Sequence, residues 1–358
     1  MRARRLTPAE VGRTAPADLA GAVLLAPARL PEGTLAKGAR LDRETAARLV
    51  AAALDGSLGR SVRLAWPGPD DVHEDEAASR LALAVGGAGV ESRPPRQSRL
   101  DLAAAWDGVL HVRAEALRRL NATEPLEVFT LFHGQAVCRG QVVCSVKVAP
   151  HLLPMTTLSE GLRIARGEGP LVEVRPYRAM EVAAVAAETT TPGALARFEA
   201  GVRTKIEALG GSFGGTTVLP DDDPDRAEAA ARDALETLVR ERNLPIVLVG
   251  GVSAGDPLSP IYAALERLGG AVLRRGVPAH PGSMIWLARL DRTQFLGLPQ
   301  CGMFSFATAA DLVLPRLFTG EALTAESLAD LAHGGLLGRE MRFRMPPYAR
   351  DLPEPDER

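Results

Sequence analysis

The sequence lacks the features that would assign a function from bulk composition alone. It contains no run of roughly 18 uninterrupted apolar residues, so we expect no membrane-spanning segment. The basic N-terminus, Met-Arg-Ala-Arg-Arg, is not followed closely by an apolar run, which argues against a signal peptide. The formal net charge of -2 provides no global basic field, so nucleic acid is not an expected partner.

Cysteine is scarce as well. Cys138, Cys144 and Cys301 form neither an even disulfide framework nor a metal-type spacing, which fits a reducing cytoplasm, and we expect the protein there. Cys138 and Cys144 flank a turn on expected strands, where packing is the expected role. Aromatic residues are few and alanine is abundant, and neither bias indicates a function.

The residues that are present describe a folded protein of more than one domain. Apolar residues make up 46% of the chain and charged residues 24%, as in globular proteins rather than disordered ones. A chain of 358 residues exceeds what one hydrophobic core usually covers, so two domains are expected.

Strand and helix signals alternate from about residue 181 onward. Helix starts are expected at Thr191-Pro192, Asp223-Pro224 and Ser259-Pro260, where a capping residue precedes proline. Residues 304–318 read as a closing helix. This alternation predicts an α/β fold, with a mostly parallel sheet covered on both faces in a three-layer α/β/α domain. The expected strands are residues 182–187, 213–219, 246–249, 272–277, 284–290 and 295–298.

The first half lacks this rhythm. It predicts one or two small α+β units, with a helix over residues 42–54 capped by Asp42, a strand at 62–65 and a helix from about residue 73 to 85. The predicted division is therefore an N-terminal α+β module at 1–150, a connecting helix and linker at 151–175, an α/β domain at 176–325 and a tail at 326–358.

A glycine-rich loop follows the strand at residues 246–249. Ligands bind beyond the carboxyl ends of strands in an open parallel sheet, and Gly250, Gly251 and Gly255 lie at that edge. Free N–H groups in such a loop favour an anion, and Ser253 adds a hydroxyl. The Asp256 carboxylate would repel a phosphate unless a cation or a sugar or pterin donor lies between them. The same pattern also fits a tight turn with a capping aspartate.

Two common phosphate-binding motifs are absent. A dinucleotide site would need G-x-G-x-x-G directly after the first strand and an acidic residue about 20 positions later. Neither is present here, and the loop has no lysine of the P-loop type.

Several stretches in order resemble one family. They are Gly250-Gly-Val-Ser-Ala-Gly-Asp256, Leu268-Gly-Gly270, Gly276-Val-Pro-Ala-His-Pro-Gly282 and Leu296-Gly-Leu-Pro299, with the acidic turn ending at Asp223. Residues 180–320 thereby resemble the molybdopterin-binding domain family, found in molybdopterin molybdenumtransferases, molybdopterin adenylyltransferases and the C-terminal part of gephyrin. The N-terminal half and residues 334–338 are similar to bacterial proteins that join this domain to a molybdenum-cofactor cytidylyltransferase; no transferase module follows here.

The resemblance implies a ligand and a set of contacts. Molybdopterin is a pterin carrying a dithiolene and a phosphate, and the loop after residue 249 would receive its anionic end. Asp222 and Asp256 would act in catalysis, and they would hold Mg²⁺ or accept pterin N–H groups. The implied cofactor-binding residues are Gly250, Gly251, Val252, Ser253, Gly255, Asp256, Pro281, Gly282, Ser283, Pro299, Gln300 and Cys301.

The chain departs from the family pattern at three loops. Residues 188–193, Glu-Thr-Thr-Thr-Pro-Gly, stand where a Thr-Gly-Asp-Glu turn is usual. Ser283-Met284 replaces the lysine and proline of Pro-Gly-Lys-Pro, and residues 300–302 replace Gly-Asn-Pro. These losses of polar groups separate two hypotheses, binding of the cofactor and catalysis of metal insertion.

Three functions follow from this reading. The leading one is a molybdopterin- or molybdenum-cofactor-binding protein of cofactor biosynthesis, at the insertion, maturation or carrier step. The second is a pyridine-nucleotide hydrolase of the competence-damage type. The third is a non-catalytic assembly partner of a cytidylyltransferase or a molybdenum hydroxylase. Homo-oligomers are common in the resembled family, and the composition does not select a state.

Four further positions have two interpretations each. Cys301 would contact molybdenum or be a buried inert side chain, and His280 would bind phosphate or lie on a solvated loop. His73-Glu-Asp-Glu76 suggests a metal or the acidic start of a helix. Arg274-Arg275 would attract an anion or form an ordinary surface pair.

Overall fold

The chain folds as two units. The computed structural model describes residues 1–95, 99–167, 169–187, 191–220, 223–298 and 306–352. Unit 1 comprises Met1–Ala105, His111–His133 and Arg139–Val174, and unit 2 comprises Trp106–Leu110, Gly134–Cys138 and Arg175–Arg358. None of the helices in these ranges is long and apolar enough to cross a membrane. The mixture of helices and several sheets confirms the expected α/β class.

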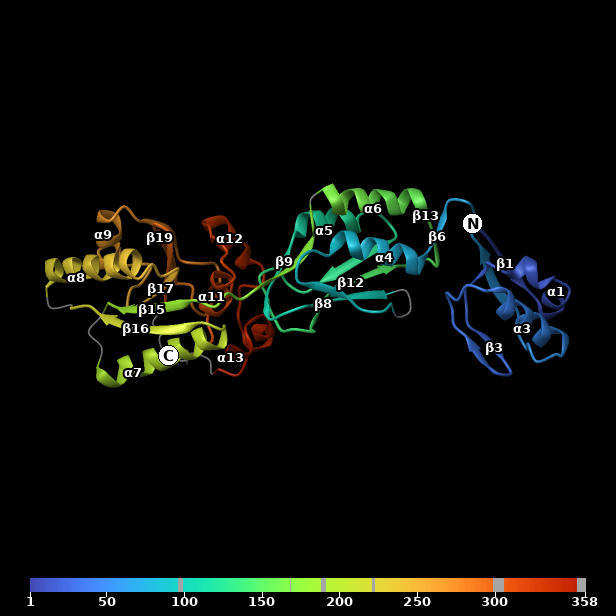
Figure 1. The fold of residues 1–358 in the computed structure, drawn as a ribbon, viewed down its shortest axis with the longest axis horizontal. Coiled ribbons are helices and arrows are strands. Elements are labelled where there is room, and N and C mark those ends of the chain that lie inside the picture. The colour runs from blue at the N-terminus through green and yellow to red at the C-terminus, as the bar shows by residue number, and fades with distance from the viewer. Residues whose placement is uncertain (96–98, 168, 188–190, 221–222, 299–305, 353–358) are drawn as a thin grey trace. The chain divides into compact units, whose positions relative to one another are not determined.

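Unit 1 consists of small antiparallel sheets with helices packed beside them (Figure 1). Its sheets have the strand orders β1–β5–β2, β3–β4, β13–β6 and β10–β12–β8–β7. A further sheet has the order β11–β9–β14, and the boundaries between the two units fall within β9 and β14. The elements are β1 (Arg2–Leu6), α1 (Pro8–Gly12), α2 (Pro16–Leu19), β2 (Val23–Leu24), β3 (Ala28–Leu30), β4 (Gly33–Leu35), α3 (Arg43–Leu54), β5 (Val62–Trp66), β6 (Asp71–His73), α4 (Glu74–Val85), β7 (Val90–Ser92), β8 (Arg99–Ala104), β9 (Gly108–Val112), α5 (Ala114–Asn121), β10 (Leu126–Thr130), β11 (Ala136–Val137), β12 (Val142–Val148), β13 (Leu152–Pro154), α6 (Met155–Gly167) and β14 (Val172–Pro176).

Local capping fixes the two predicted helices of this unit. The Asp42 carboxylate accepts the Thr45 N–H at 2.7 Å, as expected for the N-cap of α3. His73 caps α4, because its Nδ1 accepts the Asp75 N–H at 3.2 Å while Nε2 lies 2.9 Å from the Gly38 carbonyl oxygen. The acidic stretch after His73 therefore starts a helix, which is the second of the two interpretations given above. These contacts use both ring nitrogens of His73.

The expected connecting helix belongs to unit 1. It spans Met155–Gly167, and its side chains Leu158, Leu162 and Ala165 are buried. α6 packs against α4 and α5, so it is part of a core instead of a connection. The prediction of a linker at 151–175 is wrong in this respect, because the apolar face of a single helix does not reveal which neighbours cover it.

Unit 2 is built on one six-stranded sheet of order β16–β15–β17–β20–β19–β18. The pairs β15–β16, β15–β17 and β17–β20 are parallel, and β19 is antiparallel to both its neighbours, so one strand of the six runs against the rest. The remaining elements are β15 (Glu181–Ala186), α7 (Pro192–Ala208), β16 (Ser212–Val218), α8 (Pro224–Glu236), the π-helical turn η1 (Thr237–Glu241), β17 (Ile246–Gly250), α9 (Pro260–Arg267), β18 (Ala271–Arg275), β19 (Trp286–Leu290), β20 (Thr293–Gly297), α11 (Ala310–Phe318), α12 (Ala325–Ala329), the 3₁₀ turns η2 (Asp330–Ala332) and η3 (Arg339–Arg344), and α13 (Pro347–Arg350).

Side chains of this sheet alternate between two cores, as the period of a strand requires. On β15, Val182 and Ala184 face a cluster with α7 and α11, whereas Ala183 and Val185 face a cluster with α8 and α9. Figure 1 shows α8 and α9 on one face of the sheet and α7 on the other. Among the described residues, helices therefore cover both faces of the sheet.

The helix starts of unit 2 are as expected at three positions and differ at one. Thr191 and Asp223 cap α7 and α8 through their side chains, and Ser259 precedes α9 without a side-chain hydrogen bond. α11 starts at Ala310 and not at residue 304, because the Asp311 carboxylate accepts the Thr308 N–H and fixes the first turn there.

The expected C-terminal tail is part of the core of unit 2. Leu331, Leu337, Met345 and Ala349 are buried in the same cluster as α7 and α11. Leu331 lies in a short 3₁₀ turn and Ala349 in the single turn of α13, whereas Leu337 and Met345 lie between such elements at irregular spacings. No helical or strand period marks them in the sequence, which is why the prediction of an extended tail at 326–358 failed for the described residues up to 352.

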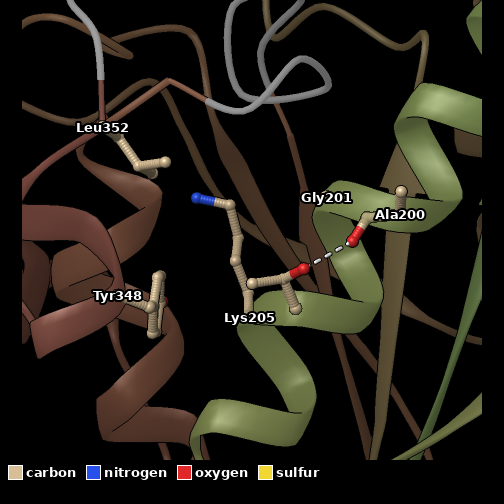
Figure 2. Close-up of a pocket in the computed structure, with 6 residues that line it drawn as sticks. Ala200, Gly201, Lys205, Tyr348 and Leu352 are labelled. Carbon is tan, nitrogen blue, oxygen red and sulfur yellow. Dashed lines mark hydrogen bonds between the residues drawn. The ribbon is translucent and has the colours of Figure 1, made fainter.

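A buried ion pair joins two elements of this core that lie far apart in sequence. Lys205 Nζ on α7 lies 2.5 Å from Asp311 Oδ1 on α11, and both side chains are almost fully buried. The other Asp311 oxygen accepts the Thr308 N–H at 2.9 Å. Figure 2 shows Lys205 facing Tyr348 and Leu352 of the C-terminal segment. These residues line a cavity of about 230 Å³. The ammonium lies 5.4 Å from the centre of the Tyr348 ring.

Replacing Lys205 by methionine is expected to lower the free energy of unfolding by about 3–5 kcal/mol, because the Asp311 carboxylate would stay buried without its cation. Chemical denaturation followed by tryptophan fluorescence measures this loss. The double variant Lys205→Met/Asp311→Asn removes both charges and keeps an oxygen for the Thr308 N–H, so it should recover most of the stability. A loss under about 1 kcal/mol in the single variant would contradict a role for the pair.

Candidate ligand-binding edge of the unit 2 sheet

The register of the sheet aligns the ends of its strands. Ala186 at the end of β15 pairs with Val218 of β16 and Gly250 of β17. Val249 pairs with Gly297 of β20, which in turn lies opposite Trp286, the first residue of β19. The carboxyl ends of four parallel strands and the start of β19 thus meet at one edge. This is the edge at which open α/β sheets bind ligands.

Trp286 is the anchor of this edge. Its indole is fully buried and lies over Gly297, where a Cβ would overlap the ring. The indole Nε1–H donates to the carbonyl oxygen of Val252 at 3.1 Å. A side chain on strand β19 therefore fixes the backbone of the loop that follows β17, and this is possible because β20 has glycine at the paired position.

Two more contacts hold the loop from behind. The Tyr262 hydroxyl of α9 donates to the carbonyl oxygen of Ser253 at 3.3 Å, and its ring meets the Trp286 ring edge-on with 5.0 Å between centroids. The Ala254 N–H donates to the Met284 carbonyl oxygen at 3.3 Å. The predicted loops at 250–256 and 281–284 are therefore neighbours in the structure.

The polar side chains of the loop are used in its own turns. Ser253 Oγ accepts the Gly255 N–H at 3.2 Å, and Asp256 Oδ1 accepts the Leu258 N–H at 3.0 Å. Both side chains are exposed. The capping interpretation of Asp256 is thus present in the structure. Its other carboxylate oxygen has no hydrogen bond to any described residue and remains open to solvent.

Three consecutive backbone amides of the loop are unpaired. The N–H groups of Gly251, Val252 and Ser253 donate no hydrogen bond to any of the residues the structure describes. Gly251 has a φ of 84°, in the left-handed region that favours glycine. Unpaired successive amides around such a residue form the kind of concavity that binds an anion.

A cation lies beside this loop. The Arg275 guanidinium stacks over the Tyr262 ring, with Cζ 4.6 Å from its centroid, and forms no ion pair within the described part of the chain. Arg274 is different, because it donates to the carbonyl oxygens of Gly276 at 2.9 Å and Ala325 at 2.7 Å. Of the two arginines proposed as an anion-attracting pair, Arg275 is the one placed for it.

Burial raises the pKa of Tyr262 to about 12, although nearby Arg275 acts in the opposite direction. The phenol is therefore neutral at physiological pH, and its hydroxyl is committed to the Ser253 carbonyl oxygen. Tyr262 serves here as a hydrogen-bond donor to the loop and not as an acid or base.

The loop at 281–283 is built for packing against α11. Gly282 has a φ of 96°, and a Cβ there would meet the Thr308 side chain at 2.7 Å. The Pro281 carbonyl oxygen accepts the Ala309 N–H at 2.9 Å, and that of Ser283 accepts the Val277 N–H at 2.8 Å. The His280 side chain is exposed, as the loop interpretation expects. These residues position Met284, whose side chain reaches Gly255.

Four of the predicted site residues, Asp222, Pro299, Gln300 and Cys301, lie outside the described residues. The departure at 188–190 does so as well. Within the described ranges no group of three or more His, Cys, Asp and Glu side chains is arranged to hold a metal ion. Of the two carboxylates predicted to hold Mg²⁺, only Asp256 is placed, so its pairing with Asp222 stays a prediction.

Cys144 fills a packing role, as its strand position suggested. It is buried on β12, and burial raises the pKa of its thiol to about 12. A thiol with that pKa is neutral and unreactive under physiological conditions.

Sequence reasoning missed two residues of this edge, Trp286 and Tyr262, whereas Arg275 was among the residues it named. Trp286 and Tyr262 looked like ordinary core residues, and only the pairing of β19 with β20 brings the indole over Gly297. The signal that could have found them is the rarity of large aromatic residues in this chain, since only three tryptophans and three tyrosines occur in it. Two of these six lie beside the glycine loop.

Comparison with known proteins gives distant similarities. No family model and no curated protein matches the chain. Among solved structures, the molybdopterin biosynthesis MoeA protein from Pyrococcus horikosii is 15% identical, with 72% of this chain and 80% of that chain covered and a TM-score of 0.27. The molybdopterin biosynthesis enzyme MoaB from Thermus thermophilus is 18% identical, with 40% and 98% covered and a TM-score of 0.27.

A NadC deletion mutant is 13% identical, with 54% of this chain and 78% of that chain covered and a TM-score of 0.16. Two of these three proteins are thus named for molybdopterin biosynthesis. Similarities at this level do not by themselves indicate a shared fold or a shared function.

Replacing Gly297 by alanine is expected to lower the free energy of unfolding by about 1–3 kcal/mol, because the new methyl group would displace the Trp286 indole. Loss of the indole contact should also speed hydrogen exchange in residues 251–258. Gly167→Ala is the matched control, since no heavy atom lies within 4 Å of the Cβ position there. Equal stability and equal exchange in the two variants would contradict the anchoring role.

Tyr262 should make the folded state less stable as the pH rises from about 10 to about 12. In this range the unfolded chain releases the phenol proton and the folded chain keeps it, so unfolding becomes more favourable. Below about pH 10 the effect is absent. Tyr262→Phe should show a shallower decline when urea denaturation is compared at about pH 9 and about pH 11. Parallel declines in the two proteins would contradict this assignment.

Proposed function

We propose that this chain binds molybdopterin or the molybdenum cofactor at the edge formed by the loops at 250–258 and 275–284, and that it acts in molybdenum-cofactor biosynthesis. The observation that supports this most directly is the run of amides from Gly251 to Ser253, which donate to no described residue, beside the Arg275 guanidinium. The identity of the ligand rests on the ordered sequence motifs, which resemble those of the molybdopterin-binding domain family.

The residues at this edge fit the anionic end of the ligand. Backbone N–H groups with no acceptor, in a glycine loop at the carboxyl end of a strand, bind phosphate without a specific side chain. Arg275 supplies the positive charge at the neighbouring position of the edge, where it is the last residue of β18. It compensates in part for the lysine that the loop at 281–284 lacks, since both would favour an anion by charge.

The same edge offers contacts for a planar heterocycle. Leu258 and Met284 are exposed apolar side chains, 87% and 44% accessible, on the two loops that meet at Gly255. A thioether and an apolar side chain pack well against an aromatic ring. The free oxygen of Asp256 would accept an N–H group of the pterin, which explains why a carboxylate follows an anion-binding loop.

The proposal also concerns the step at which the chain acts, which is either carriage of the cofactor or metal insertion. Oδ1 of Asp256 accepts a hydrogen bond within its own turn, which fixes the carboxylate in place. A fixed carboxylate can position the ligand, and binding requires no proton transfer from it. The remaining predicted contacts, Asp222, Pro299, Gln300 and Cys301, would complete the site from the neighbouring loops. We therefore propose binding and carriage of the cofactor in the first place, and metal insertion with Asp222, Asp256 and Mg²⁺ as an additional activity.

The proposal is tested by titrating the full chain with molybdopterin released from a purified molybdenum enzyme, with calorimetric or fluorescence detection. The dissociation constant should be about 1 μM or lower. Asp256→Asn keeps the turn and removes the charge, and Arg275→Gln removes the cation. Each should weaken binding about tenfold or more, because charge-assisted hydrogen bonds are lost.

Asp291→Asn is the matched control. Asp291 lies in the β19–β20 turn at the other end of the strands, with a φ of 51° that asparagine tolerates. It should bind as the unchanged protein does. Absence of binding, or equal weakening in the control, would refute the site. Release of products from nicotinamide mononucleotide, without molybdopterin binding, would favour the pyridine-nucleotide hydrolase instead.

A further inference from the structure

Positive charge gathers in residues 1–66 of unit 1. This segment contains eleven Lys and Arg residues against six Asp and Glu residues, a net charge of +5, whereas the whole chain carries -2. The remainder of the chain is therefore acidic. A local excess of this size attracts anions even though the net charge of the protein is close to zero.

Three of the six carboxylates of the segment accept hydrogen bonds from its own backbone. Glu10, Asp42 and Asp55 accept the N–H groups of Thr7, Thr45 and Ser57 at 2.7, 2.7 and 2.8 Å. These hydrogen bonds lower the pKa of all three carboxyl groups. The hydrogen bonds stabilise two helix starts and a turn. The three carboxylates form no salt bridge with an arginine of the segment.

The segment also contains a hollow of about 600 Å³. Its lining comes from the β3–β4 hairpin and from the connection between α3 and β5. Leu58 and Val62 are buried apolar residues of this lining, and Ser61 and Thr34 contribute hydroxyl groups. The volume is that of a typical small-molecule site and is large enough for a nucleotide.

Two unpaired arginines line the same hollow from its two sides. Arg29 lies on β3 opposite Thr34, and Arg60 lies in the connection before β5. Both side chains are exposed, and neither forms an ion pair or hydrogen bond with any described residue. Arg48 of the same segment, by contrast, forms an ion pair with Glu32 at 2.6 Å. No carboxylate within the described ranges forms an ion pair with Arg29 or Arg60.

Two guanidinium groups and nearby hydroxyls in one hollow match the chemistry of a phosphate chain. The planar fork of arginine fits the oxygens of phosphate in pairs, and each such contact is charge-assisted. We infer that the hollow between the β3–β4 hairpin and the α3–β5 connection binds a soluble phosphate-bearing small molecule of nucleotide size. Arg29 and Arg60 hold its phosphates, and this site is independent of the one proposed in unit 2.

Calorimetric titration of the full chain at low ionic strength tests the inference, with inorganic tripolyphosphate and ATP as probes. Both should bind, and Arg29→Gln and Arg60→Gln should each weaken the affinity about tenfold or more. Tighter binding of ATP would show that the hollow also recognises the nucleoside, and equal affinity would assign recognition to the phosphates. Either result supports the site.

Arg43→Gln is the matched control, since Arg43 is an exposed arginine of the same segment, on α3, outside the lining. It removes the same charge and should change the affinity less than about twofold. Equal weakening by Arg43→Gln would reveal a diffuse field without a site, and absence of binding by both probes would refute the inference. Asp256→Asn should leave this binding unchanged, which separates the outcome from that of the molybdopterin test.

Discussion

The packing of Trp286 over Gly297 is the contact on which the unit 2 edge depends. Trp286 and Gly297 are directly opposed on β19 and β20, so a buried indole lies across a residue without a Cβ. The ring gains the space of the missing side chain, and its N–H reaches the Val252 carbonyl oxygen on the next loop. One cross-strand pair therefore fixes the sheet and the loop together, and the Tyr262 ring closes the contact from α9.

This packing affects the carbonyl oxygens and the amide groups of the loop differently. Its carbonyl oxygens at Val252 and Ser253 accept hydrogen bonds from buried donors, while its amide groups from Gly251 to Ser253 have no acceptor among the described residues. A loop held by such contacts needs little reorganisation to bind an anion, so less binding energy is spent on ordering it. Arg275 extends the same preference by charge.

The two units differ in what they direct at a ligand. The edge in unit 2 relies mainly on backbone amides, with one arginine and one half-free carboxylate, and so suits a ligand that combines an anion with a neutral donor group. The hollow in residues 27–62 relies on side-chain guanidinium groups and hydroxyls. These different donor sets suit different molecules, which is consistent with a protein that handles a cofactor and a second phosphate compound.

Much of the fold followed from local rules in the sequence. The order of strands and helices after residue 181, the capping roles of Asp42, Thr191 and Asp223, and the position of the glycine loop after β17 are all set by neighbours within a few residues. The predicted loop residues from Gly250 to Asp256 do lie at the end of a parallel strand. Patterns of this kind are readable because caps, turns and apolar periods act over short distances.

The remaining features depend on contacts between distant segments. The buried C-terminal residues, the place of α6 in a core and the Lys205–Asp311 pair arise from packing that no local period encodes. The same holds for Trp286 and Arg275, which the register of the sheet places at this edge, and for Tyr262, which packing of α9 brings against Trp286. The local sequence is enough to place a glycine-rich loop at the end of a buried strand. Which side chains hold that loop and which charges face it depends on the fold, because register and packing join residues that are far apart in the chain.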